Sequence, residues 1–105
     1  MSDNIPMRFG LAKRWRQSAG ISVDIRQVSV DTSTLAGGGN LTGSVSVTRA
    51  GWTPSALAGF STGAASCFFA KAAIDGDVVT YNIRNAASTS ATVGPIFWVL
   101  YVREV

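Results

Sequence analysis

Residues 77–105 read DVVTYNIRNAASTSATVGPIFWVLYVREV, and this stretch decides the fold. Val79, Tyr81 and Ile83 alternate with polar residues, which is typical of a strand with one buried face. A loop of small residues follows, and residues 95–102 form a second strand that is almost wholly apolar.

This last strand is apolar on both of its faces. One face carries Ile96, Trp98, Leu100 and Val102, and the other carries Phe97, Val99 and Tyr101. A strand needs only one apolar face to cover a core, so the second face is expected to meet another sheet or another copy of the chain. We assign Phe97, Val99 and Tyr101 to an oligomer interface, which predicts a small β-sandwich that assembles.

The composition fits one domain with few charges. The chain has 105 residues, and 14% of them are charged, against about 25% in typical globular proteins. The formal net charge is +3, and four of the nine basic residues fall in the first sixteen positions: Arg8, Lys13, Arg14 and Arg16. The basicity therefore belongs to an N-terminal segment and not to a nucleic-acid-binding face.

The chain contains no histidine and one cysteine, Cys67. Without histidine it lacks the commonest general base and the commonest transition-metal ligand, and no Ser-His pair can form. Cys67 sits in an apolar run, where a buried, inert thiol is expected. We therefore expect no enzymatic activity, no bound metal and no cofactor.

Asp75, Gly76 and Asp77 give the sharpest turn signal in the chain, a tight hairpin of Asp-Gly type. The two carboxylates could also perform acid–base chemistry or bind a hard cation. Aspartate side chains commonly accept backbone N–H bonds in tight turns. We therefore assign these three residues a structural role.

Residues 1–20 differ from the rest, and we interpret them as an anchoring arm. Met7, Leu11 and Trp15 are spaced by four residues, which would place them on one stripe of a short helix. The residues expected to dock this arm on a protein partner are Met7, Arg8, Phe9, Leu11, Arg14 and Trp15. A flexible terminus and weak binding to nucleic acid or an anionic membrane are the alternatives. We favour protein docking, with no nucleic acid and no membrane, because it accounts for both the charges and the aromatic residues.

From Ile21 onward the apolar residues follow a period of two. Ile21, Val23 and Ile25 alternate, and the next apolar residue, Val28, is in the opposite phase. This slip predicts a β-bulge or a short turn at Arg26–Gln27.

Five to seven short strands with Gly- and Asn-rich corners predict an all-β domain over residues 21–105, a small antiparallel β-sandwich of jelly-roll-like form. In the strand near Cys67, the residues expected to face the core are Phe68, Ala70, Ala72 and Ile74. Trp52 follows a glycine at a corner and is expected to plug the end of the sandwich. Its alternative role is a platform on which a sugar ring stacks.

Several motifs resemble a small β-sandwich module found at the ends of proteins of tailed bacteriophages and prophages. Those modules combine a G-[YW]-T-P corner, a strand ending in G-[FWY], a glycine hairpin, an R-N dipeptide before a Ser/Ala-rich loop, and a closing strand ending in V-L-Y-V-[KR]. The corresponding residues here are Gly51-Trp52-Thr53-Pro54, Gly59-Phe60, Asp75-Gly76-Asp77, Arg84-Asn85 and Val99-Leu100-Tyr101-Val102-Arg103. The resemblance leaves out the first twenty residues.

The resemblance implies a non-enzymatic structural protein of a bacteriophage virion, on the head or on the tail. A capsid decoration protein or the base of a head fibre or spike fits best. Such a protein would dock by its arm on major capsid or tail and fibre proteins, and would oligomerise, for example as a trimer, through its β-sandwich. With no secretory signal visible, assembly in the bacterial host cytoplasm and a final place in the virion are expected. The alternative is a carbohydrate- or receptor-binding module at the tip of a tail fibre.

Overall fold

The structure is a computed structural model that describes residues 20–104. The residues predicted to dock the arm, Met7, Arg8, Phe9, Leu11, Arg14 and Trp15, lie outside the described part of the chain. The described part contains eight β-strands. Between residues 20 and 104 there is no helix long and apolar enough to cross a membrane.

The strands follow one another with short connections. They are β1 (Ile21–Ser29), β2 (Ser33–Leu35), β3 (Asn40–Ser46), β4 (Thr53–Ser61), β5 (Cys67–Asp75), β6 (Val78–Asn85), β7 (Ala91–Val93) and β8 (Ile96–Glu104).

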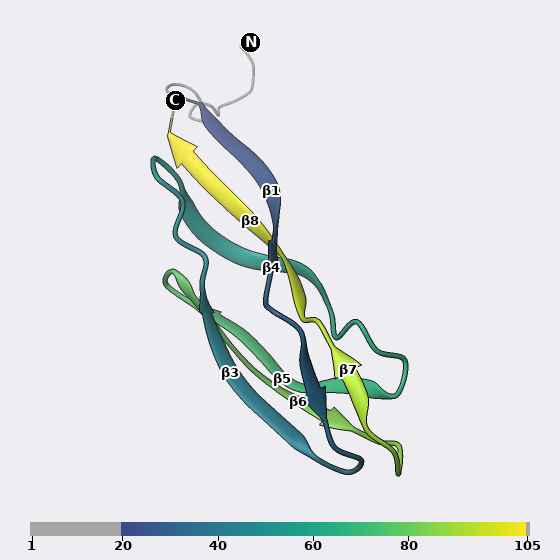
Figure 1. Ribbon diagram of the computed structural model, residues 1–105. Coiled ribbons are helices and arrows are strands. Elements are labelled where there is room, and N and C mark those ends of the chain that lie inside the picture. Colours follow the sequence, from purple (N-terminus) through teal and green to yellow (C-terminus); the bar gives the residue numbers. More distant parts are fainter. Residues whose placement is uncertain (1–19, 105) are drawn as a thin grey trace.

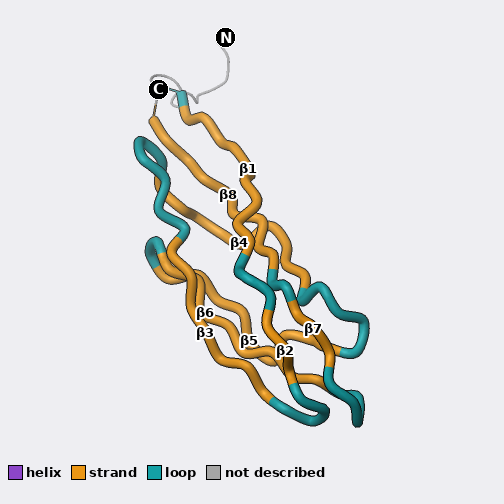
Figure 2. The backbone as a smooth tube through the Cα atoms, in the orientation of Figure 1, coloured by secondary structure: helices purple, strands orange, loops and turns teal. Residues whose placement is uncertain are grey.

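The strands form two three-stranded antiparallel sheets, β1-β8-β4 and β3-β6-β5, and a two-stranded ladder of β2 and β7. The pairs β1–β8, β2–β7 and β3–β6 are nested, as in a long hairpin folded back on itself. This is the jelly-roll-like arrangement of a small β-sandwich, so the predicted fold class is confirmed. Figure 1 shows the first sheet at the top and the second at the bottom, and Figure 2 shows β2 and β7 between the first sheet and the loops at the far end.

The two sheets overlap along only part of their length, which makes the molecule elongated, 60 × 23 × 16 Å. The core lies where β6 and β8 face each other. Its members on β6 are Val79, Tyr81 and Ile83, all 5% exposed or less, as their alternation predicts. Aromatic rings fill its middle, with the centroids of Tyr81 and Phe97 5.4 Å apart.

The prediction for β8 named the wrong face. Phe97, Val99 and Tyr101 are 0%, 0% and 2% exposed within the single chain, so they are core residues and are not available to an oligomer interface. The alternation is as predicted, but a strand that is apolar on both faces does not itself indicate which face meets the second sheet. The apolar face of β6 covers this one, and the opposite face of β8 is only half-buried.

The expected bulge at Arg26–Gln27 is absent, because β1 pairs with β8 in one unbroken register from Ile21 to Ser29. The change of apolar phase has another cause. The second sheet lies beneath the Val28 end of β1, where Val28 packs on the core, and does not extend beneath the Ile21 end. Near Ile21 the apolar side chains therefore point to the outer face of the sheet.

A register shift does occur in β5, between Phe69 and Lys71. It reverses the phase of the strand, so that Phe69 packs against the core while Phe68 is 49% exposed. The prediction that placed Phe68 and Ala70 in the core is wrong for this reason, whereas Ala72 and Ile74, beyond the shift, do pack on it.

Candidate functional site

The outer face of the β1-β8-β4 sheet is apolar. Val23 lies opposite Val102, and Ile25 lies opposite Leu100. Residues directly opposite each other in an antiparallel pair project to the same side of the sheet. We call this surface the outer apolar face; its residues on β1 and β8 are Ile21, Val23, Ile25, Ile96, Trp98, Leu100 and Val102.

Exposure on this face differs between the two strands. Ile21, Val23 and Ile25 are 71%, 62% and 52% exposed, whereas the β8 residues beside them are half-buried. The Trp98 ring lies over β4, where a β-carbon added at Gly59 would be 3.5 Å from it. Contiguous large apolar side chains on a surface mark an interaction site more often than isolated ones. This face is therefore the main candidate for a protein interface.

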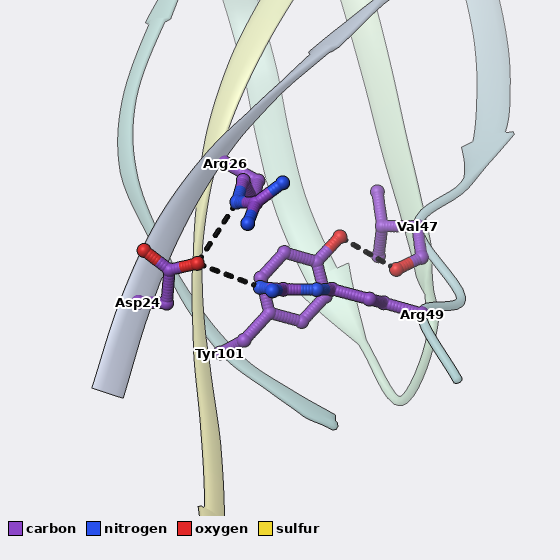
Figure 3. Close-up of polar contacts among 5 residues, drawn as sticks. All are labelled: Asp24, Arg26, Val47, Arg49 and Tyr101. Atoms are coloured by element: carbon purple, nitrogen blue, oxygen red, sulfur yellow. Dashed lines mark hydrogen bonds and ion pairs between the residues drawn. The ribbon is translucent and has the colours of Figure 1, made fainter. Parts of the chain in front are cut away.

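The inner face of the same sheet carries a polar cluster near the Ile21 end (Figure 3). One Asp24 carboxylate oxygen accepts hydrogen bonds from Arg26 Nε at 2.8 Å and from Arg49 Nη1 at 3.1 Å. The hydrogen bond from Arg26 is the main cause that holds the pKa of Asp24 below its ordinary value; desolvation opposes it, and the hydrogen bond from Arg49 and the positive charges of both arginines lower the pKa further. The Tyr101 hydroxyl donates to the Val47 carbonyl oxygen at 2.7 Å.

Trp52 belongs to the same cluster. The guanidinium carbon of Arg49 lies 4.3 Å from the Trp52 ring centroid, and that of Arg103 lies 4.4 Å from it. Both are cation–π distances, and the indole is half-buried. These contacts support the structural role predicted for Trp52, because guanidinium groups of the chain itself occupy surface on which a sugar would stack.

The cluster closes the end of the core. Val47 is 2% exposed, and the chain that follows it brings Arg49 and Trp52 across the inner face of β1 and β8. The backbone N–H of Trp52 donates to the Arg49 carbonyl at 3.1 Å, which holds this turn. Polar side chains are suited to this place because the second sheet does not cover it.

The hairpin between β5 and β6 has a two-residue turn, Gly76 and Asp77, since Asp75 pairs with Val78. Gly76 has a φ of +60°, the left-handed conformation that the turn signal predicts. The Asp77 carboxylate accepts a hydrogen bond from Thr48 Oγ1 at 2.9 Å. Among residues 20–104, no three His, Cys, Asp or Glu side chains gather in a way that could hold a metal ion. The contacts of Asp77 support a structural role.

Asn85 is only 2% exposed, although the sequence patterns did not predict it as a core residue. Its Nδ2 donates to the carbonyl oxygens of Leu35 at 3.1 Å and Thr89 at 2.9 Å, and also approaches that of Ala36. Its Oδ1 accepts from Ser66 Oγ at 3.0 Å and from a backbone N–H of the following loop. One side chain thus joins three connecting segments. The available signal was its phase, because it continues the buried series of odd-numbered residues on β6.

Comparisons of the chain with protein-family models, with curated proteins and with solved structures find no match in any of the three. A function is therefore inferred from the side chains that the surface of residues 20–104 presents. Asp24 is paired with Arg26 and Arg49, and Asp77 bonds to Thr48 beside a turn, whereas Ile21, Val23 and Ile25 of the outer apolar face are more than half exposed. Binding of another protein surface is the chemistry that this arrangement offers.

Proposed function

We propose that this protein is a non-enzymatic structural component of a bacteriophage virion that assembles with copies of itself. The observation that carries the assembly is the outer apolar face, where three β-branched side chains of one strand are more than half exposed. Burying such side chains contributes about 1.5–3 kcal/mol each when burial is complete. The fold contributes a rigid sheet on which this surface is displayed.

The assignment to a virion comes from the motif resemblance. In the proposal, the sandwich serves as a capsid decoration protein or as the base of a head fibre or spike. Residues 1–20 anchor it to a capsid or tail protein. The low share of charged residues, 14%, agrees with a surface that is largely in contact with neighbours.

The experiment is a count of this protein in purified particles by quantitative mass spectrometry, relative to the major capsid protein. A fixed, repeated stoichiometry supports a decoration or fibre-base role. A protein that is absent from particles while present in the infected cell contradicts it.

The alternative is a carbohydrate- or receptor-binding module at the tip of a tail fibre, and one observation favours it. Phe60 and Phe68 are 50% and 49% exposed and flank the loop over residues 62–66. Exposed aromatic rings at a loop are candidates for stacking on a sugar. Binding to a glycan array that is lost in both Phe60→Ala and Phe68→Ala, with the fold retained, would favour this function over a capsid role.

A further inference from the structure

We propose that β1 pairs along its free edge with β1 of a second copy, antiparallel, so that two β1-β8-β4 sheets join into one six-stranded sheet. The inference rests on the proposed self-assembly and adds the strand, the partner and the register. Backbone hydrogen bonding between sheet edges is a general mode of association between protein chains.

The first support is the contrast in exposure within the outer apolar face. Leu100 and Val102, on the central strand, have neighbours on both sides and are half-buried. Val23 and Ile25 lie directly opposite them and are 62% and 52% exposed. Within residues 20–104, β1 has a strand neighbour on one side only. A strand added at the free edge of β1 would place neighbouring side chains on both sides of Val23 and Ile25, as Leu100 and Val102 of β8 already have.

The second support is the difference between β1 and the other edge of the same sheet. β4 contains Pro54 and two register shifts, between Pro54 and Ala56 and between Leu57 and Gly59. Proline and bulges are two of the means by which edge strands avoid pairing with other chains. β1 contains neither, and its nine residues pair with β8 without interruption. It therefore presents a long, regular edge.

The edges of the second sheet are less suited to pairing. β5 has a register shift and an exposed lysine, Lys71, on its edge. β3 is regular, but the side chains on its outer side are polar, and none of its residues is among the exposed large apolar ones. Of the four edges of the two three-stranded sheets, β1 alone is regular and apolar.

The third support is that the charges of β1 are self-complementary in one register. Antiparallel pairing centred on Ile25 overlaps all nine residues and places Asp24 opposite Arg26 of the partner subunit, twice over by symmetry. Centring on Asp24 would set Asp24 opposite Asp24 of the partner subunit, and centring on Arg26 would set the two arginines together. Opposite charges across a strand pair are stabilising and like charges are destabilising. The register centred on Ile25 is the favoured one, and its two-fold symmetry gives a closed dimer.

Apolar contacts agree with this register. Ile25 of each copy meets its counterpart on the axis, and each Val23 lies diagonally across from Ile25 of the partner subunit. Diagonal neighbours in antiparallel sheets are within reach of branched side chains. The four side chains would form an apolar cluster on the outer face, continuous with Leu100 and Val102 of both copies.

Disulfide trapping in the full-length chain tests the proposal. In the proposed register the two Ile25 Cα atoms are about 4.5–5.5 Å apart, within the about 4.4–6.8 Å range of disulfides. Ile25→Cys should give a covalent dimer under mild oxidation. Gln27→Cys is the matched control, because it is exposed on the same face two residues away, and its counterpart would lie about 13 Å distant. Wild type reports any reaction of Cys67, which is buried.

A dimer that is at least tenfold more abundant for Ile25→Cys than for Gln27→Cys supports the pairing. The double variant Val23→Cys/Gln27→Cys should also crosslink, and it serves if Ile25→Cys fails to fold. Equal dimer yields for Ile25→Cys and Gln27→Cys would overturn the proposal. The absence of a dimer from folded Ile25→Cys and from the folded double variant would also overturn it. That absence is the result expected if residues 1–19 cover this edge instead. If light scattering still finds an oligomer, edge pairing is wrong and self-assembly stands.

Discussion

Gly43 of β3 lies directly opposite Tyr81 of β6, and the Tyr81 ring occupies the space into which a side chain at position 43 would extend. A β-carbon there would be 2.5 Å from the Tyr81 hydroxyl oxygen and 2.7 Å from the ring carbon that bears it. Tyr81 is 5% exposed, and its burial raises the pKa of the hydroxyl. The packing of this tyrosine over the sheet therefore requires glycine at position 43.

Gly43→Ala should destabilise the fold by about 1–3 kcal/mol, the usual cost of forcing an extra carbon into a packed core. The control is Gly59→Ala on β4, where the new β-carbon would make an ordinary 3.5 Å contact with Trp98. Urea denaturation of both variants measures the difference. Equal free energies of unfolding for Gly43→Ala and wild type would show that the Tyr81 ring moves freely, contrary to this account.

Asn85→Asp should lower the free energy of unfolding by about 2 kcal/mol or more. The substitution keeps the shape but replaces a donor with an oxygen that faces the carbonyl oxygens of Leu35 and Thr89, and buried polar atoms without partners are costly. Asn82→Asp is the control, because within residues 20–104 the Asn82 side chain donates a single hydrogen bond, to Thr42 Oγ1 at 2.8 Å on the sheet surface. If Asn85→Asp lowers the free energy of unfolding no more than Asn82→Asp does, Asn85 does not hold the three connecting segments together.

The alternation of Val79, Tyr81 and Ile83 predicted a strand and its buried face correctly, because one face was clearly polar. The sequence of β8 did not allow the same choice, since both of its faces are apolar. The slip between Ile25 and Val28 was misinterpreted for a related reason. A period of two in the apolar residues indicates only that side chains alternate between the two faces of a strand. Which face is buried depends on how far the second sheet extends beneath that strand.

The hairpin turn could be predicted from local sequence, whereas the contacts of the polar residues could not. Gly76 was predicted to take a positive φ from turn chemistry, which is local, and it does. Asn85 and the Asp24–Arg49 pair depend on partners 50 and 25 residues away in the chain. Such pairings follow from the tertiary arrangement, and local patterns carry little information about them.

Gly76→Val should lower stability by roughly 1 kcal/mol or more, because a β-branched residue poorly tolerates a φ of +60°. Asp75→Asn should be nearly neutral, since asparagine keeps the side-chain oxygen and suits turns. Thermal melts with calcium and with chelator measure both variants and wild type. A calcium-dependent rise of several degrees that Asp75→Asn abolishes would make this hairpin a cation site instead of a structural turn.

Deleting residues 1–20 should leave the β-sandwich folded, because the core described here is built from residues 21–104. The truncated protein should fail to enter particles if these residues are the anchor. Circular dichroism checks the fold, and immunoblotting of purified particles checks incorporation. Normal occupancy without residues 1–20 would exclude the arm as the anchor, and loss of the fold would place it within the domain.

The molar mass in solution tests the central claim most directly. Size-exclusion chromatography with light scattering at micromolar concentration should give a multiple of the 11.0 kDa chain mass. Val23→Lys should shift the protein toward monomer, because it sets a charge within the outer apolar face on the free edge, whereas Ser44→Lys, exposed on the other sheet, should not. A wild-type protein that remains an 11.0 kDa monomer would contradict assembly through this face.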